Sequence, residues 1–169
     1  MAVSAYEVIS ATTVGTAAQT VTLSSIPQTY TDLVVVVNAF SSIQSDLYVY
    51  FNSDNTANYS RTAIWGDGAT AGSNRIVRTD GYSFMVLTYY GAVTTTQGAS
   101  VHTVNIMNYS NTNTYKTVLS RTNAAAVGID ATVGMWGSTA AISSMTFDLA
   151  STRTFSVGST FTLYGIKAA

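Results

Sequence analysis

Apolar and polar residues alternate with a period of two in short blocks along the chain, and turn-forming residues separate these blocks. Leu47, Val49 and Phe51 alternate with two tyrosines, and Met145, Phe147 and Leu149 alternate with polar residues. A period of two is the pattern of a β-strand that buries one face. The same alternation predicts further strands in the blocks at 3–9, 20–23, 101–108 and 161–166.

A continuously aliphatic block, Leu33–Val37, predicts a strand that is covered on both faces. Turn-forming residues, such as those at Asn52–Asn55 and Gly66–Gly68, separate the predicted strands. Roughly nine or ten strands at intervals of about 10–20 residues, with no helical period, predict an all-β fold. We expect a two-sheet antiparallel β-sandwich that is jelly-roll-like, and at most one helical turn at Ala124–Val127.

The 169 residues are expected to form one β-sandwich domain over the whole chain, 1–169. Residues 1–18 are an extended amino-terminal strand or, alternatively, an arm that lies on a neighbouring subunit. The alternation of Val3, Ala5 and Ile9 favours the strand.

Composition agrees with a β-fold. The chain has 27 Thr and 20 Ser, but seven Leu, one Glu and two Lys, so it lacks the residues that build helix surfaces. Charged residues make up 9% and the net charge is −1, which argues against a nucleic-acid partner. A surface of hydroxyls rather than charges suits proteins that pack against neighbours, although many β-sandwiches are simply rich in Ser and Thr.

Neither a membrane span nor a secretion signal is predicted. The longest aliphatic run, Leu33–Val37, has five residues, whereas a spanning helix needs about 20. Met1–Ile9 has no basic segment and no apolar stretch of signal-peptide length. We therefore expect a protein that has no membrane partner and that is made and kept in a cytoplasm, or leaves it by a route that uses no amino-terminal signal.

The chain offers little for catalysis. It has no cysteine and a single histidine, His102, so a Cys–His pair and a multi-histidine metal site are excluded. No Gly-x-Ser-x-Gly elbow is present. His102 shares a strand face with Val104 and Ile106, which favours a core or interface residue. The prediction is a protein that is not an enzyme and needs no cofactor.

The aspartates flank predicted turns, where Asp commonly bonds its own backbone. No spacing singles out two of them as a hydrolytic carboxylate pair; the candidates are Asp46, Asp54, Asp67 and Asp80. Calcium binding at Asp54–Asn55 or Gly66–Gly68 is an alternative, but the spacing matches no EF-hand loop.

Aromatic residues at strand ends and on outward faces are the better candidates for a binding surface. In the last block, Phe161 and Leu163 are predicted to face the core, and Tyr164 and Ile166 the opposite side, at an oligomer interface or beneath a covering loop. For the two tryptophans, Trp65 and Trp136, the alternative expectation is that their side chains close the two ends of the sandwich core. The interface candidates are Tyr48, Tyr50, Trp65, Trp136, Tyr164 and Ile166.

Three segments resemble small structural proteins of tailed bacteriophages. The first is Ser24–Leu33, SSIPQTYTDL, which leads into the long aliphatic strand. The second is Phe51-Asn52 followed by Asn58–Ser60, and the third is the end of the chain, Phe161–Lys167, FTLYGIK. Ala124–Val133 matches no part of this pattern and is expected to be a contact loop.

The resemblance implies a virion component that is assembled in the host cytoplasm. We expect a capsid decoration or cement protein, a homotrimer that binds the major capsid protein on the capsid exterior and stabilises the shell. The alternative is a tail- or fibre-associated adhesin that binds host surface glycans through Trp65 or Tyr48.

Overall fold

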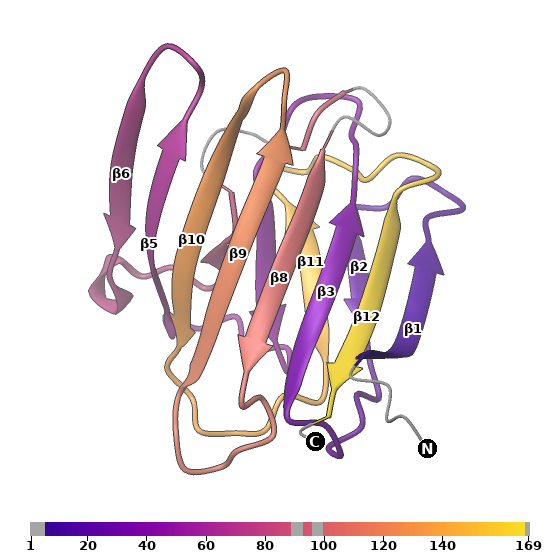
Figure 1. The fold of residues 1–169 in the computed structure, drawn as a ribbon, viewed down its shortest axis with the longest axis vertical. Helices are drawn as coiled ribbons and strands as arrows, with labels where there is room; N and C mark the ends of the chain where they lie inside the picture. Colours follow the sequence, from indigo (N-terminus) through magenta and orange to yellow (C-terminus); the bar gives the residue numbers. More distant parts are fainter. Residues whose placement is uncertain (1–5, 89–92, 96–99, 168–169) are drawn as a thin grey trace.

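The computed structural model describes residues 6–88, 93–95 and 100–167. The described residues form twelve strands in two antiparallel sheets, which confirms the predicted all-β sandwich (Figure 1). The strands are β1 (Tyr6–Thr13), β2 (Thr20–Leu23), β3 (Asp32–Asn38), β4 (Leu47–Phe51), β5 (Tyr59–Gly66), β6 (Ala71–Ile76), β7 (Met85–Val86), β8 (Val101–Met107), β9 (Lys116–Ala124), β10 (Gly128–Trp136), β11 (Met145–Leu149) and β12 (Thr160–Ile166). One 3₁₀ turn, η1 (Arg78–Asp80), follows β6.

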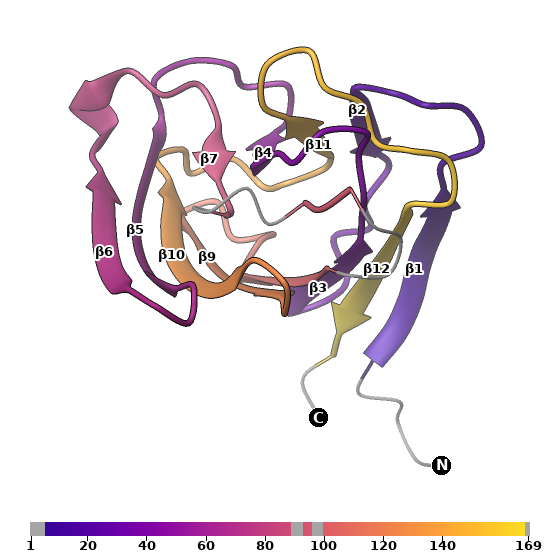
Figure 2. The ribbon, with the colours of Figure 1, turned by 90° about the horizontal axis from the view of Figure 1, so that it is seen from above.

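The strand order is that of a jelly roll with two added hairpins. The large sheet has the order β1-β12-β3-β8-β9-β10-β5-β6, and the small sheet β2-β11-β4-β7 (Figures 1 and 2). Without the hairpins β5–β6 and β9–β10, the pairs β1 with β12, β2 with β11, β3 with β8 and β4 with β7 are nested. Such nesting arises when one long antiparallel hairpin is rolled into two sheets, which is the jelly-roll topology.

Both hairpins extend the large sheet, so it has eight strands while the small sheet has four. The contact loop expected at Ala124–Val133 is wrong, because this segment forms the β9–β10 turn and most of β10. Its alternation was hidden because the inward residues of β10, among them Asp130, Thr132 and Gly134, are polar or small rather than aliphatic.

One continuous apolar core joins the two sheets. Phe161 and Leu163 of β12 are 0% and 1% exposed, which confirms that they face inward. The ring of Phe161 lies 5.4 Å from that of Phe147 in the small sheet and 5.1 Å from that of Phe155. Because aromatic rings bury large areas, this cluster ties the carboxyl-terminal strand to the opposite sheet.

The inner face of the large sheet, which faces the small sheet, is covered in part by an irregular segment after β7. Five of its described residues, Leu87, Thr88, Val93, Thr94 and Ser100, are buried, and Thr95 is exposed. Buried irregular backbone needs hydrogen-bond partners. Ser120 Oγ donates to the Leu87 carbonyl at 3.1 Å, and Ser100 Oγ of the segment donates to the carbonyl of Ala39, which follows β3, at 2.8 Å.

His102 belongs to this buried polar region. It is fully buried on β8, and its Nδ1 lies 3.2 Å from Thr122 Oγ1 on β9. His102 is therefore a core residue, as its shared face with Val104 and Ile106 predicted. Burial lowers its pKa from 6.5 to about 4, because the charged imidazolium loses its hydration there.

Replacing Leu163 with alanine should lower the free energy of unfolding by about 2–5 kcal/mol, because it leaves a cavity in a packed core. Urea denaturation measures the loss. Thr162→Ala, at the next and half-buried position of β12, should change stability by less than about 1 kcal/mol. Equal losses in the two variants would contradict the inward assignment of Leu163.

The buried histidine should make folding stability depend on pH. Its folded-state pKa lies below the unfolded value, so the unfolded chain takes up the proton first; stability is fully present above pH 6.5 and is lost as pH falls toward about 4. The wild type should lose about 2 kcal/mol between pH 7 and pH 5. The variant His102→Gln should show no such slope, and a slope that persists in it would assign the effect to another group.

Candidate functional site

The outer face of the large sheet, which points away from the small sheet, carries exposed aliphatic side chains on β5, β9 and β10. We call four of them the outer patch: Ile64, Leu119, Ile129 and Val133, which are 63%, 42%, 61% and 48% exposed. Exposed apolar residues are ordinary when scattered, but a contiguous group marks an interaction surface.

Strand register makes the outer patch contiguous. Ile64 pairs with Ala131 across β5 and β10, and Val133 pairs with Leu119 across β10 and β9. Ile129 and Val133 flank Ala131 along β10, on the same face. The four side chains therefore cover three neighbouring strands around Ala131, whose partner on β9 is Arg121.

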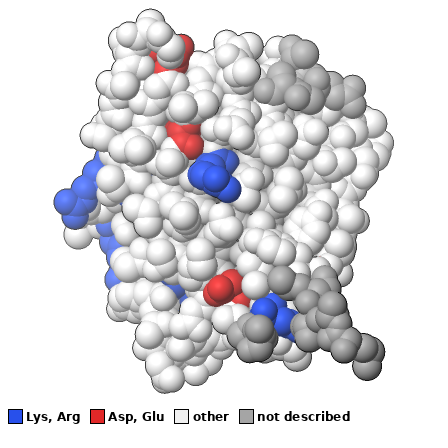
Figure 3. All heavy atoms as spheres, in the orientation of Figure 1, with Lys and Arg blue, Asp and Glu red and all other residues white. Residues whose placement is uncertain are grey.

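Few charges interrupt this side of the molecule. Figure 3 shows it as mostly uncharged, with isolated charged groups. At the outward positions of β5, β6, β9 and β10, the charged residues are Arg75 and Arg121. A partner that covers the face would thus desolvate little charge.

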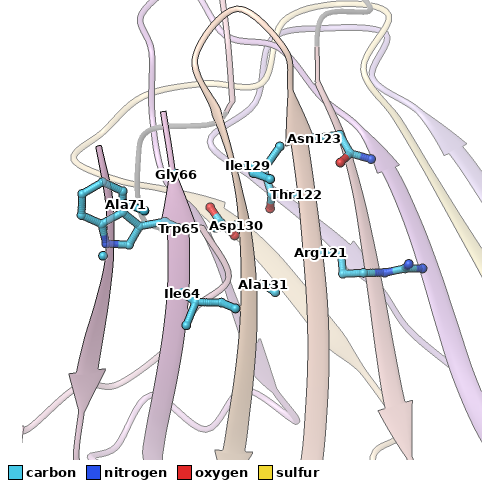
Figure 4. A pocket seen from close by; sticks show the side chains of 11 residues that line it. Ile64, Trp65, Gly66, Ala71, Arg121, Thr122, Asn123, Ile129, Asp130 and Ala131 are labelled. Atoms are coloured by element: carbon cyan, nitrogen blue, oxygen red, sulfur yellow. The ribbon is translucent and has the colours of Figure 1, made fainter. Parts of the chain in front are cut away.

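A hollow of about 520 Å³ adjoins the outer patch where β5, β6, β9 and β10 approach their hairpin turns (Figure 4). Small residues such as Gly66, Ala71 and Ala131 line it, next to Ile64 and Ile129. Arg121 extends along the sheet toward β8 and not toward the tryptophan at the other side of the hollow.

Trp65 also lines this hollow, although its position on β5 is in inward register with Asp130 of β10. Its indole lies across Gly72 of β6, where a Cβ atom would come within 2.6 Å of the ring. Glycine at position 72 therefore permits the close approach that fixes the orientation of the indole.

Tyr164 and Ile166 lie on the outer face too, but toward its other edge, on β12. Both are half-buried between side chains of neighbouring strands. The ring of Tyr164 stands edge-on to that of Tyr6 on β1, with centroids 6.3 Å apart. They point away from the core, as predicted.

Tyr48 and Tyr50 lie on the outward face of the small sheet, on the opposite side of the molecule. Both are half-buried, and the Tyr48 ring stacks on Phe84 at 4.2 Å. The structure thus does not bring the predicted interface residues together.

Trp136 is wrong as an interface candidate, because it is 2% exposed and belongs to the core. Its Nε1 donates to Asp54 Oδ2 at 2.7 Å, and its ring lies 5.6 Å from that of Phe51. Trp136 is the last residue of β10, and its side chain points inward. It therefore closes one end of the sandwich core, which is the alternative that the sequence predicted for the tryptophans.

The aspartates mostly hold turns, as expected. Asp54 accepts hydrogen bonds from the Thr56 backbone and hydroxyl, and from Asn58 Nδ2. Asp67 accepts from the backbone of Ala69 and Thr70. Because these oxygens serve protein donors, neither turn presents a set of free ligands for calcium.

Across the described ranges, no group of three or more His, Asp or Glu side chains converges on a point that would hold a metal ion. In the same part of the chain, no helix has the length and apolar character needed to cross a membrane.

The outer patch escaped sequence reasoning. Its residues lie outward on β5, β9 and β10, and the alternation predicts no strand at β5 or β10. A hairpin alignment of 116–124 with 128–136 pairs Leu119 with Val133, which indicates this half of the patch but not Ile64.

No protein-family model matches the chain, and a search of curated proteins gives no match either.

The carboxylate of Asp54 should make the Trp136 end of the sandwich sensitive to acid. Burial raises its pKa, but the hydrogen bonds it accepts outweigh burial and lower the pKa from 3.8 to about 2. This contribution to stability is present above pH 3.8 and is lost as pH falls toward 2.

Asp54→Asn should therefore be less stable than wild type at pH 7, and the difference should shrink as pH falls through this window. Denaturation curves followed by tryptophan fluorescence measure it. Asn55→Ala, at the exposed neighbouring position, is the control and should behave as wild type. A difference that is independent of pH would contradict a role for the ionised carboxylate.

Proposed function

We propose that the chain is a non-enzymatic structural protein of a tailed-bacteriophage virion, which decorates or cements the capsid by binding the outer surface of the major capsid protein shell. The resemblance of Ser24–Leu33 and Phe161–Lys167 to small phage structural proteins supports the virion class. These two segments lead into or contain β3 and β12, which pair along their length. The remaining part of the resemblance, Phe51-Asn52 with Asn58–Ser60, lies at the end of β4 and the start of β5.

The outer patch is the observation that carries the binding role. Eight strands spaced about 4.8 Å apart span about 38 Å, and seven residues span about 23 Å, so the outer face presents about 900 Å². A stable protein interface buries about 800 Å² on each partner. A broad, curved face of this area (Figure 2), low in charge and with the outer patch over β5, β9 and β10, suits contact with a large protein surface better than contact with a small ligand.

In this proposal the outer face spans adjacent capsid subunits and adds interface area that resists internal pressure from packaged DNA. Many copies repeat each contact by symmetry, so modest contacts add up. Assembly as a homotrimer would place Tyr164 and Ile166 between subunits, while the outer patch contacts the capsid.

The copy number in purified particles tests the location. Particles of the phage whose genome encodes the chain should contain hundreds of copies on a stained gel, as a decoration protein requires. A handful of copies would overturn decoration in favour of a tail- or fibre-associated adhesin. Absence from the particles would overturn the virion proposal.

Ile64→Asp should abolish binding to particles stripped of the protein, because it places a charge at the centre of the apolar contact. The matched control is Ile43→Asp, since Ile43 is 57% exposed and lies in the loop between β3 and β4, off the sheet face. Co-sedimentation measures binding, and particle heat stability measures cementing. Equal binding of both variants, or heat stability unchanged by wild-type protein, would overturn the proposal.

A further inference from the structure

The outer face has three hollows that follow one another along the pairing of β5 with β10. Their volumes are about 520, 230 and 470 Å³. Ile64 and Ala131 line both the first and the second hollow, and Thr62 and Val133 line both the second and the third. Because each hollow shares residues with the next, the three form one continuous groove, which we call the seam groove.

The seam groove arises from the sizes of the residues that pair outward across the two strands. Three successive outward pairs each join a larger aliphatic residue to a smaller one: Gly66 with Ile129, Ile64 with Ala131 and Thr62 with Val133. Glycine has no side chain and alanine has only a methyl group. The floor of the groove is therefore open at these positions, while the aliphatic side chains form its walls.

The hollows repeat at the spacing of side chains on one face of an extended chain. They lie around positions 129–131, 131–133 and 133–135 of β10. Two residues of an extended chain span about 6.8 Å, so a segment that runs along β10 places its residues i, i+2 and i+4 over the three hollows.

The width of the seam groove also favours an extended segment. The backbones of β5 and β9, whose side chains Ile64 and Leu119 flank the groove, lie two strand spacings apart, which is about 9.6 Å. An α-helix with its side chains is about 10–12 Å wide, and the flanking side chains narrow the space further. A helix would thus rest on the walls, whereas an extended segment reaches the floor.

The chemistry changes along the groove. The first two hollows are mostly apolar and suit apolar side chains at i and i+2. The third is more polar, because Arg75 and the hydroxyls of Ser60 and Thr117 line it. Arg75 is exposed at an outward position of β6, opposite Thr62 of β5.

The charge of the groove selects the third residue. The outward positions of β5, β6, β9 and β10 carry no aspartate or glutamate. Asp130 borders the first hollow, but it is in inward register and 6% exposed. The guanidinium of Arg75 therefore favours an acidic side chain at i+4.

We propose that the seam groove binds an extended segment of the major capsid protein, with apolar residues at i and i+2 and an acidic residue at i+4. All four residues of the outer patch line this groove, so the segment occupies the centre of the proposed capsid contact. The inference deepens the capsid-binding proposal and rests on it for the identity of the partner. Three hollows of different chemistry fix the direction and the register of the segment.

The test uses the isolated chain and three blocked pentapeptides, so it needs no particles. Leu-Thr-Ile-Thr-Glu has the expected pattern, Leu-Ile-Thr-Thr-Glu has the same composition with the wrong spacing, and Leu-Thr-Ile-Thr-Lys has the wrong charge. Each is titrated to about 5 mM into the isotopically labelled chain and followed by NMR, because so short a segment binds weakly. The first peptide should shift the signals of β5 and β10 and bind about fivefold or more tightly than the other two.

Arg75→Glu should reverse the preference between the glutamate and the lysine peptide, because it reverses the charge beside the third hollow. Arg121→Glu is the matched control. Arg121 is exposed on the same face, but its guanidinium extends toward β8, as Figure 4 shows, so this variant should keep the wild-type preference.

Ala131→Leu should weaken binding of the first peptide by about tenfold or more, because it fills the floor that the first two hollows share. The matched control is Ala11→Leu, since Ala11 is exposed and pairs with the outward Thr162 at the far edge of the same face. Circular dichroism and unfolding midpoints confirm that each variant is folded before its affinity is compared.

Any of four results would overturn the extended-segment proposal: no binding of the first peptide, equal affinity for its isomer, an unchanged charge preference in Arg75→Glu, or equal affinity in Ala131→Leu and wild type. The capsid proposal would survive these results if the protein still sediments with stripped particles. Conversely, peptide binding as expected by a protein that is absent from particles would overturn the capsid protein as the source of the segment.

Discussion

The unequal width of the two sheets is the constraint on which the rest of this structure depends. Two hairpins widen the large sheet to eight strands, and the small sheet has only four with which to cover it. Strands of a sheet bury their inward side chains only where another layer lies against them. The remainder of the inner face therefore had to be covered in another way, and this decided which residues are buried, which are polar and where cavities lie.

The irregular segment after β7 covers part of the inner face. Its backbone N–H and C=O groups need hydrogen-bond partners, which a purely apolar core would not supply. Ser120 donates to the carbonyl of Leu87 in this segment, and Ser100 of the segment donates to the carbonyl of Ala39. The buried His102 forms a hydrogen bond with Thr122. Lys116 shows the same principle at the other end of β9: it is fully buried, and its Nζ donates to three backbone carbonyls, those of Asn111, Thr114 and Thr139. Burial without such donors and acceptors would be costly.

At two positions the β5–β6 hairpin departs from the usual amphipathic pattern of a sheet, although its inward Tyr59, Ala63 and Ile76 are buried as that pattern requires. Its outward Ile64 is 63% exposed, while its inward Arg61 is 6% exposed. In an ordinary sandwich strand the aliphatic residue would be buried and the arginine solvated. A protein surface that covers the outer patch, as proposed, would explain the exposed isoleucine, and the hydrogen bond to Asn74 holds part of the buried guanidinium.

The sequence by itself determined the strands whose inward residues are aliphatic or aromatic, such as Leu47–Phe51, Met145–Leu149 and Phe161–Ile166, and the turns held by Asp54 and Asp67. Only the tertiary structure decided which faces are covered. A period of two shows which residues share a face, but the layer against that face comes from strands distant in the chain. Hence β10, whose inward residues include Asp130 and Gly134, was mistaken for a loop, Trp136 proved to be core, and the outer patch appeared only when β5, β9 and β10 were paired.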